Sequence, residues 1–271
     1  MQLTKPRIAI IIPAYKSEKT LARTLASLAD NTTPHDIVIV DDFSPVPVLD
    51  SGVPLPPNAT VIRLDRNQGV TAATNAGLRY ILERGYDYAA RLDSDDTASP
   101  DRLELQLAYM DQHPEMALIG GAGEVVSETG ETLFYLNHPT DFETILKKLF
   151  YNSCFLQPTF MIRAEALRKY GLYDESFPNA EDYELVRRYA RHAKIGNLSH
   201  YLIRYTVSSG GLSVSKRRQQ LRLRLRVQWR YRDFRSIHFY LGILKTLVLW
   251  FMPMGLITAV KQRLSAYKAK T

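Results

Sequence analysis

The segment YAARLDSDDTASPD, residues 88–101, joins a short apolar strand to a cluster of acids. Residues 88–92 are apolar apart from Arg91. Three carboxylates then follow within four positions: Asp93, Asp95 and Asp96. Residues 99–101 (SPD) have the features of the cap, first turn and early acid of a new helix. The segment predicts a buried strand ending in an acidic loop, and ligands in α/β sheets bind at that end of the strands.

Asp93 and Asp95 are candidate metal ligands, because carboxylates two residues apart suit hard divalent cations, which take oxygen ligands. Asp96 is expected to help cap the following helix. A solvated acidic turn is the alternative interpretation of the same acids, since short acidic loops are common. Other segments of the chain decide between the two.

The segments around the acidic loop predict an α/β fold. Four runs have the length and composition of buried strands: residues 7–12, 36–40, 60–64 and 86–92. Helical patterns separate them, one over residues 21–28 with Ser17 as a possible N-cap and one over residues 69–83. This alternation favours a doubly wound, mostly parallel sheet.

The turn after the first strand bears on how this sheet would hold a nucleotide. It contains Pro13, Ala14 and Tyr15 and no G-x-G-x-x-G, and no G-x-x-x-x-G-K-[ST] loop occurs in the chain. A bound diphosphate would therefore need another partner, and Mg²⁺ or Mn²⁺ held by Asp93 and Asp95 would supply one. This argument favours the metal site over the solvated turn.

Composition limits the class of protein. The 271 residues are 45% apolar and 23% charged, which suits one large α/β domain, alone or with an appendage. The single cysteine, Cys154, excludes an internal disulfide framework and fits a reducing compartment. The apolar run over residues 8–12, which Pro13 ends, is too short for a signal peptide. We therefore expect a cytoplasmic protein.

The carboxyl-terminal part differs from the rest. Residues 216–271 contain 14 Lys and Arg against one acid, Asp233, and residues 239–260 are apolar apart from Lys245 and a few hydroxyls. We predict a catalytic domain over residues 1–212 and a helical tail over residues 213–271. Lys245 within this apolar run, and the proline and glycine that break the run into two shorter pieces, argue against a membrane span. We therefore expect two short helices on an anionic membrane surface. Packing of the pair on the catalytic domain or on a dimer partner is the alternative.

Five segments carry a family resemblance: IIPAYKSEKT (11–20), VDDFSP (40–45), RNQGVTAATNAG (66–77), ARLDSDDTASPDRLELQ (90–106) and AEDYELVRR (180–188). In order and spacing they resemble family 2 glycosyltransferases, which are inverting enzymes of the GT-A fold that use nucleotide-diphospho-sugars. The resemblance covers roughly residues 7 to 205. It implies the same fold class that the strand pattern predicts.

The resemblance implies roles for individual residues in binding the donor. The residues implied at the nucleoside, the closing loop and the sugar-phosphate are Pro13, Ala14, Tyr15, Glu18, Asp42, Asn67, Gly69, Asn75, Asp93 and Ser94. Asp42 would accept a hydrogen bond from the pyrimidine, and Asp95 would hold the metal. Two alternatives stay open: Tyr15 only packs its loop, and Asn75 makes a structural hydrogen bond.

The catalytic base is expected in a different segment. Inversion needs a carboxylate opposite the leaving group, across the sugar from the metal. The resemblance favours Asp182, beside Glu181, at the start of a helix whose positive dipole end would keep Asp182 ionised. The alternative is that both acids only cap that helix.

The resemblance implies a metal-dependent, inverting transferase that moves a hexosyl or N-acetylhexosaminyl group from a donor such as a UDP-sugar. The acceptor would be a hydroxyl of a glycan or lipid-linked glycan in cell-surface polysaccharide biosynthesis, on the inner face of the membrane. Transfer to polyprenyl phosphate is a second hypothesis. Nucleic-acid binding through the basic tail is a third, but it would leave the acidic motifs unexplained, so no nucleic-acid partner is expected.

Overall fold

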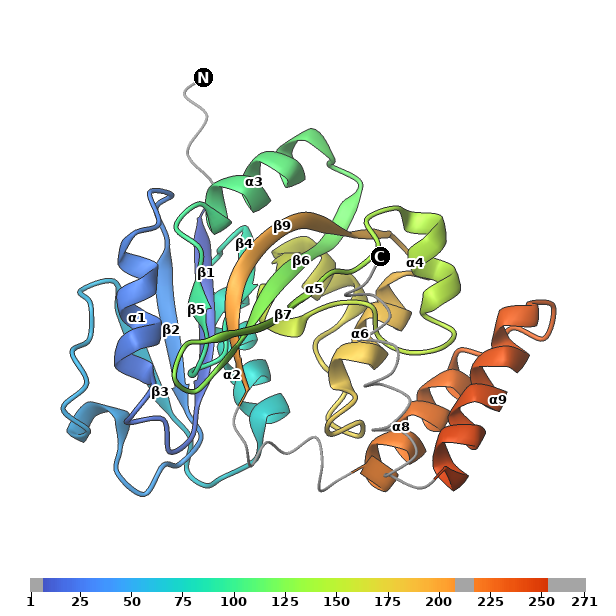
Figure 1. Cartoon of the computed structure of the whole chain (residues 1–271). Helices are drawn as coiled ribbons and strands as arrows, with labels where there is room; N and C mark the ends of the chain where they lie inside the picture. Colours follow the sequence, from blue (N-terminus) through green and yellow to red (C-terminus); the bar gives the residue numbers. More distant parts are fainter. Residues whose placement is uncertain (1–6, 208–216, 253–271) are drawn as a thin grey trace.

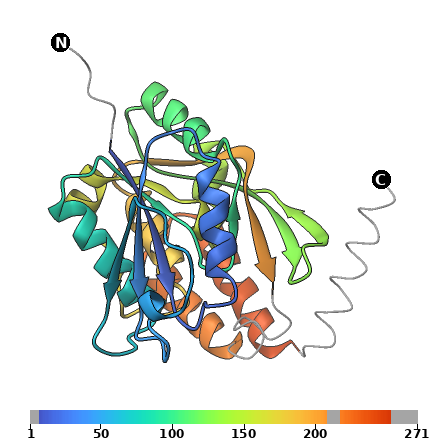
Figure 2. The same ribbon diagram turned by 90° about the vertical axis from the view of Figure 1, so that its left-hand side faces the viewer.

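A computed structural model describes residues 7–207 and 217–252, which form one nine-stranded sheet with helices on both faces (Figures 1 and 2). The strands are β1 (Ile8–Ala14), β2 (Asp36–Asp41), β3 (Ala59–Arg63), β4 (Tyr88–Arg91), β5 (Thr97–Ala98), β6 (Met116–Ser127), β7 (Thr132–Leu136), β8 (Met161–Arg163) and β9 (Lys194–Val207). The α-helices are α1 (Leu21–Ala29), α2 (Val70–Glu83), α3 (Arg102–Gln112), α4 (Phe142–Lys148), α5 (Ala164–Tyr170), α6 (Glu181–Tyr189), α8 (Arg217–Arg230) and α9 (Ile237–Phe251). Short 3-10 turns occur at η1 (Val48–Asp50) and η2 (Gln157–Thr159).

The strand order is β3-β2-β1-β4-β8-β6-β9-β5, with β7 paired to β6. The first four neighbours are parallel, as the alternation of strands and helices predicts, and β8 is antiparallel to both β4 and β6. The chain leaves β1 toward β2 and β3, then returns to place β4 on the other side of β1. In an open α/β sheet such a reversal leaves a crevice at the carboxyl ends of the strands.

The central strands are buried on both faces. All seven residues of β1 are buried, and alternate side chains enter opposite core clusters. Ile8, Ile10 and Ile12 pack with helices α1 and α3, whereas Ile11 packs with α2. Because side chains alternate along a strand, a continuous β-branched run supplies both layers.

Two local predictions differ from the structure. The residue before α1 is Thr20 rather than Ser17, and its side chain makes no cap hydrogen bond. Helix α3 begins at Arg102, with Asp101 before it, so residues 99–101 precede the helix instead of opening it. Strand β5, which was not predicted, occupies residues 97–98 because β9 offers it an antiparallel edge.

The two carboxyl-terminal helices lie side by side at one end of the molecule (Figure 1). The basic segment is helical, as its Leu, Arg and Gln content favours over its strand-like alternation. Leu223, Val227 and Tyr231 lie in the same core cluster as the sheet. The predicted boundary at residue 212 lies outside the described residues. Within them, no helix is both long and apolar enough to cross a membrane.

Candidate active site

A cavity of about 850 Å³ opens beside the carboxyl ends of β1, β2 and β4, at the reversal of strand order. We call it the donor cavity. The predicted site residues that line it are Pro13, Ala14, Tyr15, Asp42, Asn67, Gly69, Asp93, Ser94 and Asp95. Four separate segments thus converge at one sheet edge, and the volume lies within the range of about 300–1,000 Å³ that is typical of pockets for small organic ligands.

Asp42 holds the loop that covers one side of the donor cavity. Its carboxylate accepts hydrogen bonds from the backbone N–H groups of Gln68, at 2.7 Å, and Gly69, at 2.8 Å. Its backbone carbonyl accepts from the Asn67 side chain at 3.1 Å. Gly69 has φ +88°, a left-handed conformation that glycine adopts without strain, and the helix α2 starts directly after it. The neighbouring Asp41 has a structural role, because it accepts from the N–H groups of the loop after β2.

Tyr15 is 45% exposed at the rim of the donor cavity. Its ring is not packed away inside the loop, so an apolar face is available to a flat ligand. Pro13 and Ala14 beside it are buried at the end of β1. These three residues therefore combine a rigid strand end with an exposed aromatic ring.

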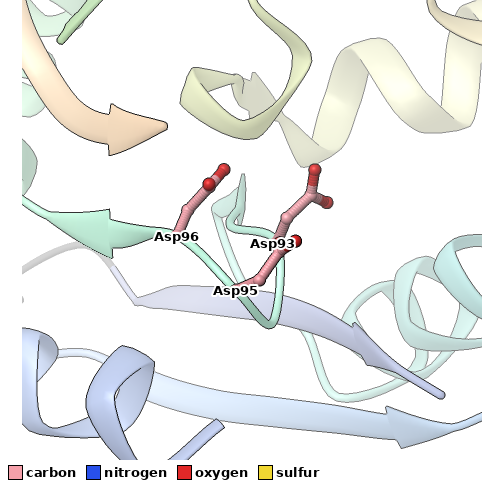
Figure 3. A group of neighbouring side chains, drawn as sticks. All are labelled: Asp93, Asp95 and Asp96. Carbon is pink, nitrogen blue, oxygen red and sulfur yellow. The ribbon is translucent and has the colours of Figure 1, made fainter. Parts of the chain in front are cut away.

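Asp93, Asp95 and Asp96 come from one loop after β4 (Figure 3), and each offers an oxygen within 4.8 Å of the others. Asp96 was expected to help cap α3, but it does not. It is fully buried, and its Oδ1 accepts from the backbone N–H of Thr206 on β9 at 2.8 Å. Its Oδ2 has no hydrogen-bond partner among the described residues. The sequence prediction for Asp96 was wrong because the β9 backbone, distant in sequence, takes its carboxylate.

The electrostatics of this loop favour a divalent cation. Partial desolvation and the charge of Asp93 raise the pKa of Asp95, and burial with the charges of Asp93 and Asp95 raises the pKa of Asp96 well above its ordinary range. Carboxylates that repel one another and an unpaired buried oxygen are relieved by a hard ion with oxygen ligands. The residues present therefore fit Mg²⁺ or Mn²⁺.

Arg91 is a site residue to which the sequence analysis gave no role. It is 4% exposed at the end of β4, lines the donor cavity, and donates from Nη2 to Asp93 at 2.5 Å. Its Nε and Nη1 have no partner among the described residues. Charge interactions connect it with acids on both sides: Asp93, Asp95, Glu181 and Asp182. The sequence did contain one signal for this role, because Arg91 is the single charged residue in an otherwise apolar strand.

Glu181 and Asp182 occupy the first turn of α6, after Ala180 as N-cap, which makes no side-chain cap hydrogen bond. Glu181 is 6% exposed, and its Oε2 has no partner among the described residues. Burial and the neighbouring charge of Asp182 raise the pKa of Glu181 to about 7. Burial also raises the pKa of Asp182. The expectation that the helix dipole keeps Asp182 ionised is therefore too simple, because desolvation acts in the opposite direction and is larger.

Asp182 lines a smaller cavity next to the donor cavity, and Asn179 lines both. Three predicted residues line neither: Glu181, described above, Glu18 and Asn75. Glu18 lies in the turn before α1, and Asn75 is buried in α2. The Asn75 side chain donates to the carbonyl of Tyr173 and to the Glu175 carboxylate, both at 2.9 Å, which is the structural alternative considered above. Asn75 thus positions Glu175, a residue of the donor-cavity wall that was not predicted.

The chain has the same fold as two proteins whose structures were solved in complex with a nucleotide-sugar. One is residues 1–349 of TarS from S. aureus in complex with UDP-GlcNAc, with TM-score 0.64, 21% identity and coverage of 89% of this chain and 71% of that one. The other is the mannosyltransferase PcManGT from Pyrobaculum calidifontis in complex with GDP-Man and Mn²⁺, with TM-score 0.66, 14% identity and coverage of 98% and 82%. The fold is therefore the GT-A type predicted from the motifs.

The family model for glycosyl transferase family 2 matches residues 9–171, so the chain belongs to that family. Similar curated proteins include the amylovoran biosynthesis glycosyltransferase AmsE of Erwinia amylovora, 29% identical over 78% of this chain and 79% of that protein. The O-antigen biosynthesis glycosyltransferase WbnJ of Escherichia coli is 34% identical over 45% of this chain and 48% of that protein. An uncharacterized glycosyltransferase of Haemophilus influenzae is 32% identical over 58% and 57%. The last two matches span only about half of those relatives.

Proposed function

We propose that this protein transfers a sugar, with inversion, from a nucleotide-diphospho-sugar to a hydroxyl of a glycan or lipid-linked glycan in surface-polysaccharide biosynthesis. One observation carries the proposal: the donor cavity and the cavity of Asp182 adjoin at Asn179, so a nucleotide-sugar in the first would extend toward the second. The names of the relatives AmsE and WbnJ support the polysaccharide part. A UDP-sugar is our choice of donor, because a carboxylate at Asp42 can accept from the uracil N–H.

Each part of the site has a role in this reaction. The loop held by Asp42 and the ring of Tyr15 bind the nucleoside, and Ser94 lies at the same wall. Asp95 and Asp93 would hold Mg²⁺ or Mn²⁺, which supplies charge neutralisation at the diphosphate. Arg91 adds a buried positive charge that interacts with an acid of each cavity, Asp95 and Asp182.

Asp182 is the proposed base that takes the proton of the attacking hydroxyl, and Glu181 is its buried partner. A raised pKa makes a carboxylate a stronger base as long as the site is ionised at the working pH. Because Glu181 has a pKa of about 7, the pair shares its protons near neutrality.

A donor screen that detects released nucleoside diphosphate tests the proposal. Wild type with an acceptor extract should turn over one donor, and EDTA should abolish turnover. Asp182→Asn should reduce the rate about 10²- to 10⁴-fold, the range for a lost general base, while leaving nucleotide affinity intact. The matched control is Asp111→Asn, at an exposed aspartate on α3. Turnover that neither EDTA nor Asp182→Asn changes would remove the mechanism.

We also propose that α9 attaches the protein to an anionic membrane surface. Seven apolar side chains are exposed at helical spacing along one face: Ile237, Tyr240, Leu241, Leu244, Leu247, Val248 and Phe251. The opposite face, with Phe239, Gly242 and Thr246, is buried against the protein. Exposed arginines lie on the neighbouring α8 and the turn after it: Arg218, Arg222, Arg226, Arg230, Arg232 and Arg235. An apolar stripe beside a basic surface fits an anionic lipid interface.

Flotation with vesicles tests this attachment. Deletion of residues 213–271 is unsuitable, because it would remove Leu223 and Val227 from the core. Wild type should float with vesicles containing phosphatidylglycerol, less so at high salt, and Leu244→Asp with Phe251→Asp should not float. A self-associating protein whose dimer depends on the same two residues, and which ignores vesicles, would show that a second copy covers the stripe instead.

A further inference from the structure

The smaller cavity beside the donor cavity has a volume of about 190 Å³ and draws its wall from three distant parts of the chain. Its lining includes Asn152, Ser153, Asn179, Asp182, Gln220 and Arg224. The last two come from α8, outside the segment 9–171 that the family model covers. The cavity is below the 300 Å³ typical of whole-ligand pockets, so it suits one group of an acceptor.

Arg224 is the one cation in this lining, and it is half-buried. Among the described residues it has no ion pair within 4.0 Å and no hydrogen bond. Burial lowers the pKa of Arg224, whereas its electrostatic interactions with Tyr183 and Asp182 act in the opposite direction. A partly desolvated guanidinium without a salt bridge has free donors for an incoming anion.

Arg187 and Arg230, at the same end of the molecule, are already engaged. Arg230 pairs with Asp174 at 2.6 Å, and Arg187 donates to the backbone carbonyl of Tyr231 at 2.6 Å. Those contacts hold α8 on the catalytic core. Arg224, which has no such contact among the described residues, lines the cavity that contains the proposed base.

The helix α8 presents Arg224 from a rigid position. Gln220, Arg224 and Gln228 follow at four-residue intervals, which places them along one face of the helix. Gln228 is 2% exposed and donates to the carbonyl of Phe150 at 2.9 Å. Leu223 and Val227 are buried in the core. These contacts fix the backbone that carries Arg224, so ligand binding there has to order only the side chain.

Building on the proposed function, we infer that Arg224 binds an oxyanion of the acceptor, a phosphate or a carboxylate, next to the hydroxyl that Asp182 deprotonates. A guanidinium matches either anion with two parallel hydrogen bonds. The acceptor is then an anionic saccharide, either a uronic acid or a sugar near the phosphate of a carrier. The basic helix α8 is therefore part of the acceptor site, and it determines which acceptors the site binds.

Ligand-observed NMR titrations test this inference without knowledge of the natural acceptor. The probes are methyl phosphate, methyl glucuronide and, as the neutral reference, methyl glucoside. Wild type should bind one of the two anions at least tenfold more tightly than methyl glucoside, and the preferred anion identifies its source as phosphate or carboxylate. Arg224→Gln should abolish the preference. Arg218→Gln, which removes an exposed charge from the same helix, should keep it.

Anion binding in the donor cavity is common to all variants and cancels in the comparison. Arg224→Lys keeps the charge but loses the two-pronged geometry, so it should retain only part of the preference, and it carries the test should Arg224→Gln fail to fold. Nucleotide affinity on the same samples reports on the proposed function separately. Equal anion binding by wild type and Arg224→Gln, or no anion preference in wild type, would overturn the inference.

Discussion

Replacement of Glu181 by glutamine should stabilise the protein while impairing the site. Folding raises the pKa of Glu181 from its ordinary 4.5 to about 7, chiefly by burial. The folded state binds this proton more tightly than the unfolded state does. Protonation of Glu181 therefore stabilises the fold fully below pH 4.5, and this contribution is lost as the pH rises through 7. At 1.36 kcal/mol per pKa unit, the raised pKa lowers the free energy of unfolding, relative to its value at low pH, by about 3 kcal/mol at pH 8 and about 1 kcal/mol at pH 5.

Glutamine cannot ionise and therefore escapes this cost. Glu181→Gln should raise the free energy of unfolding relative to wild type by about 2–3 kcal/mol more at pH 8 than at pH 5. Urea unfolding at the two pH values measures the difference, with a midpoint shift of roughly 1 M for an m-value near 3 kcal/mol/M. Glu104→Gln, at an exposed glutamate in the first turn of α3, is the control and should change stability by only a few tenths of a kcal/mol.

The pH dependence is the decisive feature. A variant with the same stability change at pH 5 and pH 8 would refute the reasoning, because it would mean that Glu181 does not carry a raised pKa in the folded protein. Destabilisation at pH 8 would do so more strongly. A buried acid that lowers stability at neutral pH is expected where function requires it.

Three further outcomes follow from the structure. Asp42→Asn leaves one loop N–H without its carboxylate acceptor, so nucleotide affinity should fall about tenfold in calorimetric titration. In Gly242→Ala the new Cβ would lie 2.1 Å from the backbone oxygen of Phe150, so thermal unfolding should show a loss of about 2–3 kcal/mol. Gly196→Ala, whose Cβ meets only ordinary contacts at 3.6 Å or more, is its control. The rate of transfer should fall as the pH drops below about 7, because the pair containing Asp182 then takes up a proton, and a flat pH–rate profile would contradict this.

Local pattern alone was sufficient for much of the fold. The β-branched run of β1 and the alternation with α1 and α2 predicted the parallel half of the sheet, because strand and helix periodicity are properties of neighbouring residues. The same reasoning located the acids after β4, whereas the pair at the start of α6 was singled out by the family resemblance. Ends of elements were less accurate, as at α3, where the capping pattern lies before the helix.

The tertiary structure decided which of these residues act together. Asp96 was assigned to a helix cap but meets Thr206, and Arg91 connects acids that lie about ninety positions apart in the chain. The cavity of Asp182 needs α8, whose composition indicated only a basic tail. Sequence therefore determined the strands, the helices and the chemical groups that they carry. Their partners, burial and pKa values depended on contacts between distant segments, which only packing of the whole chain creates.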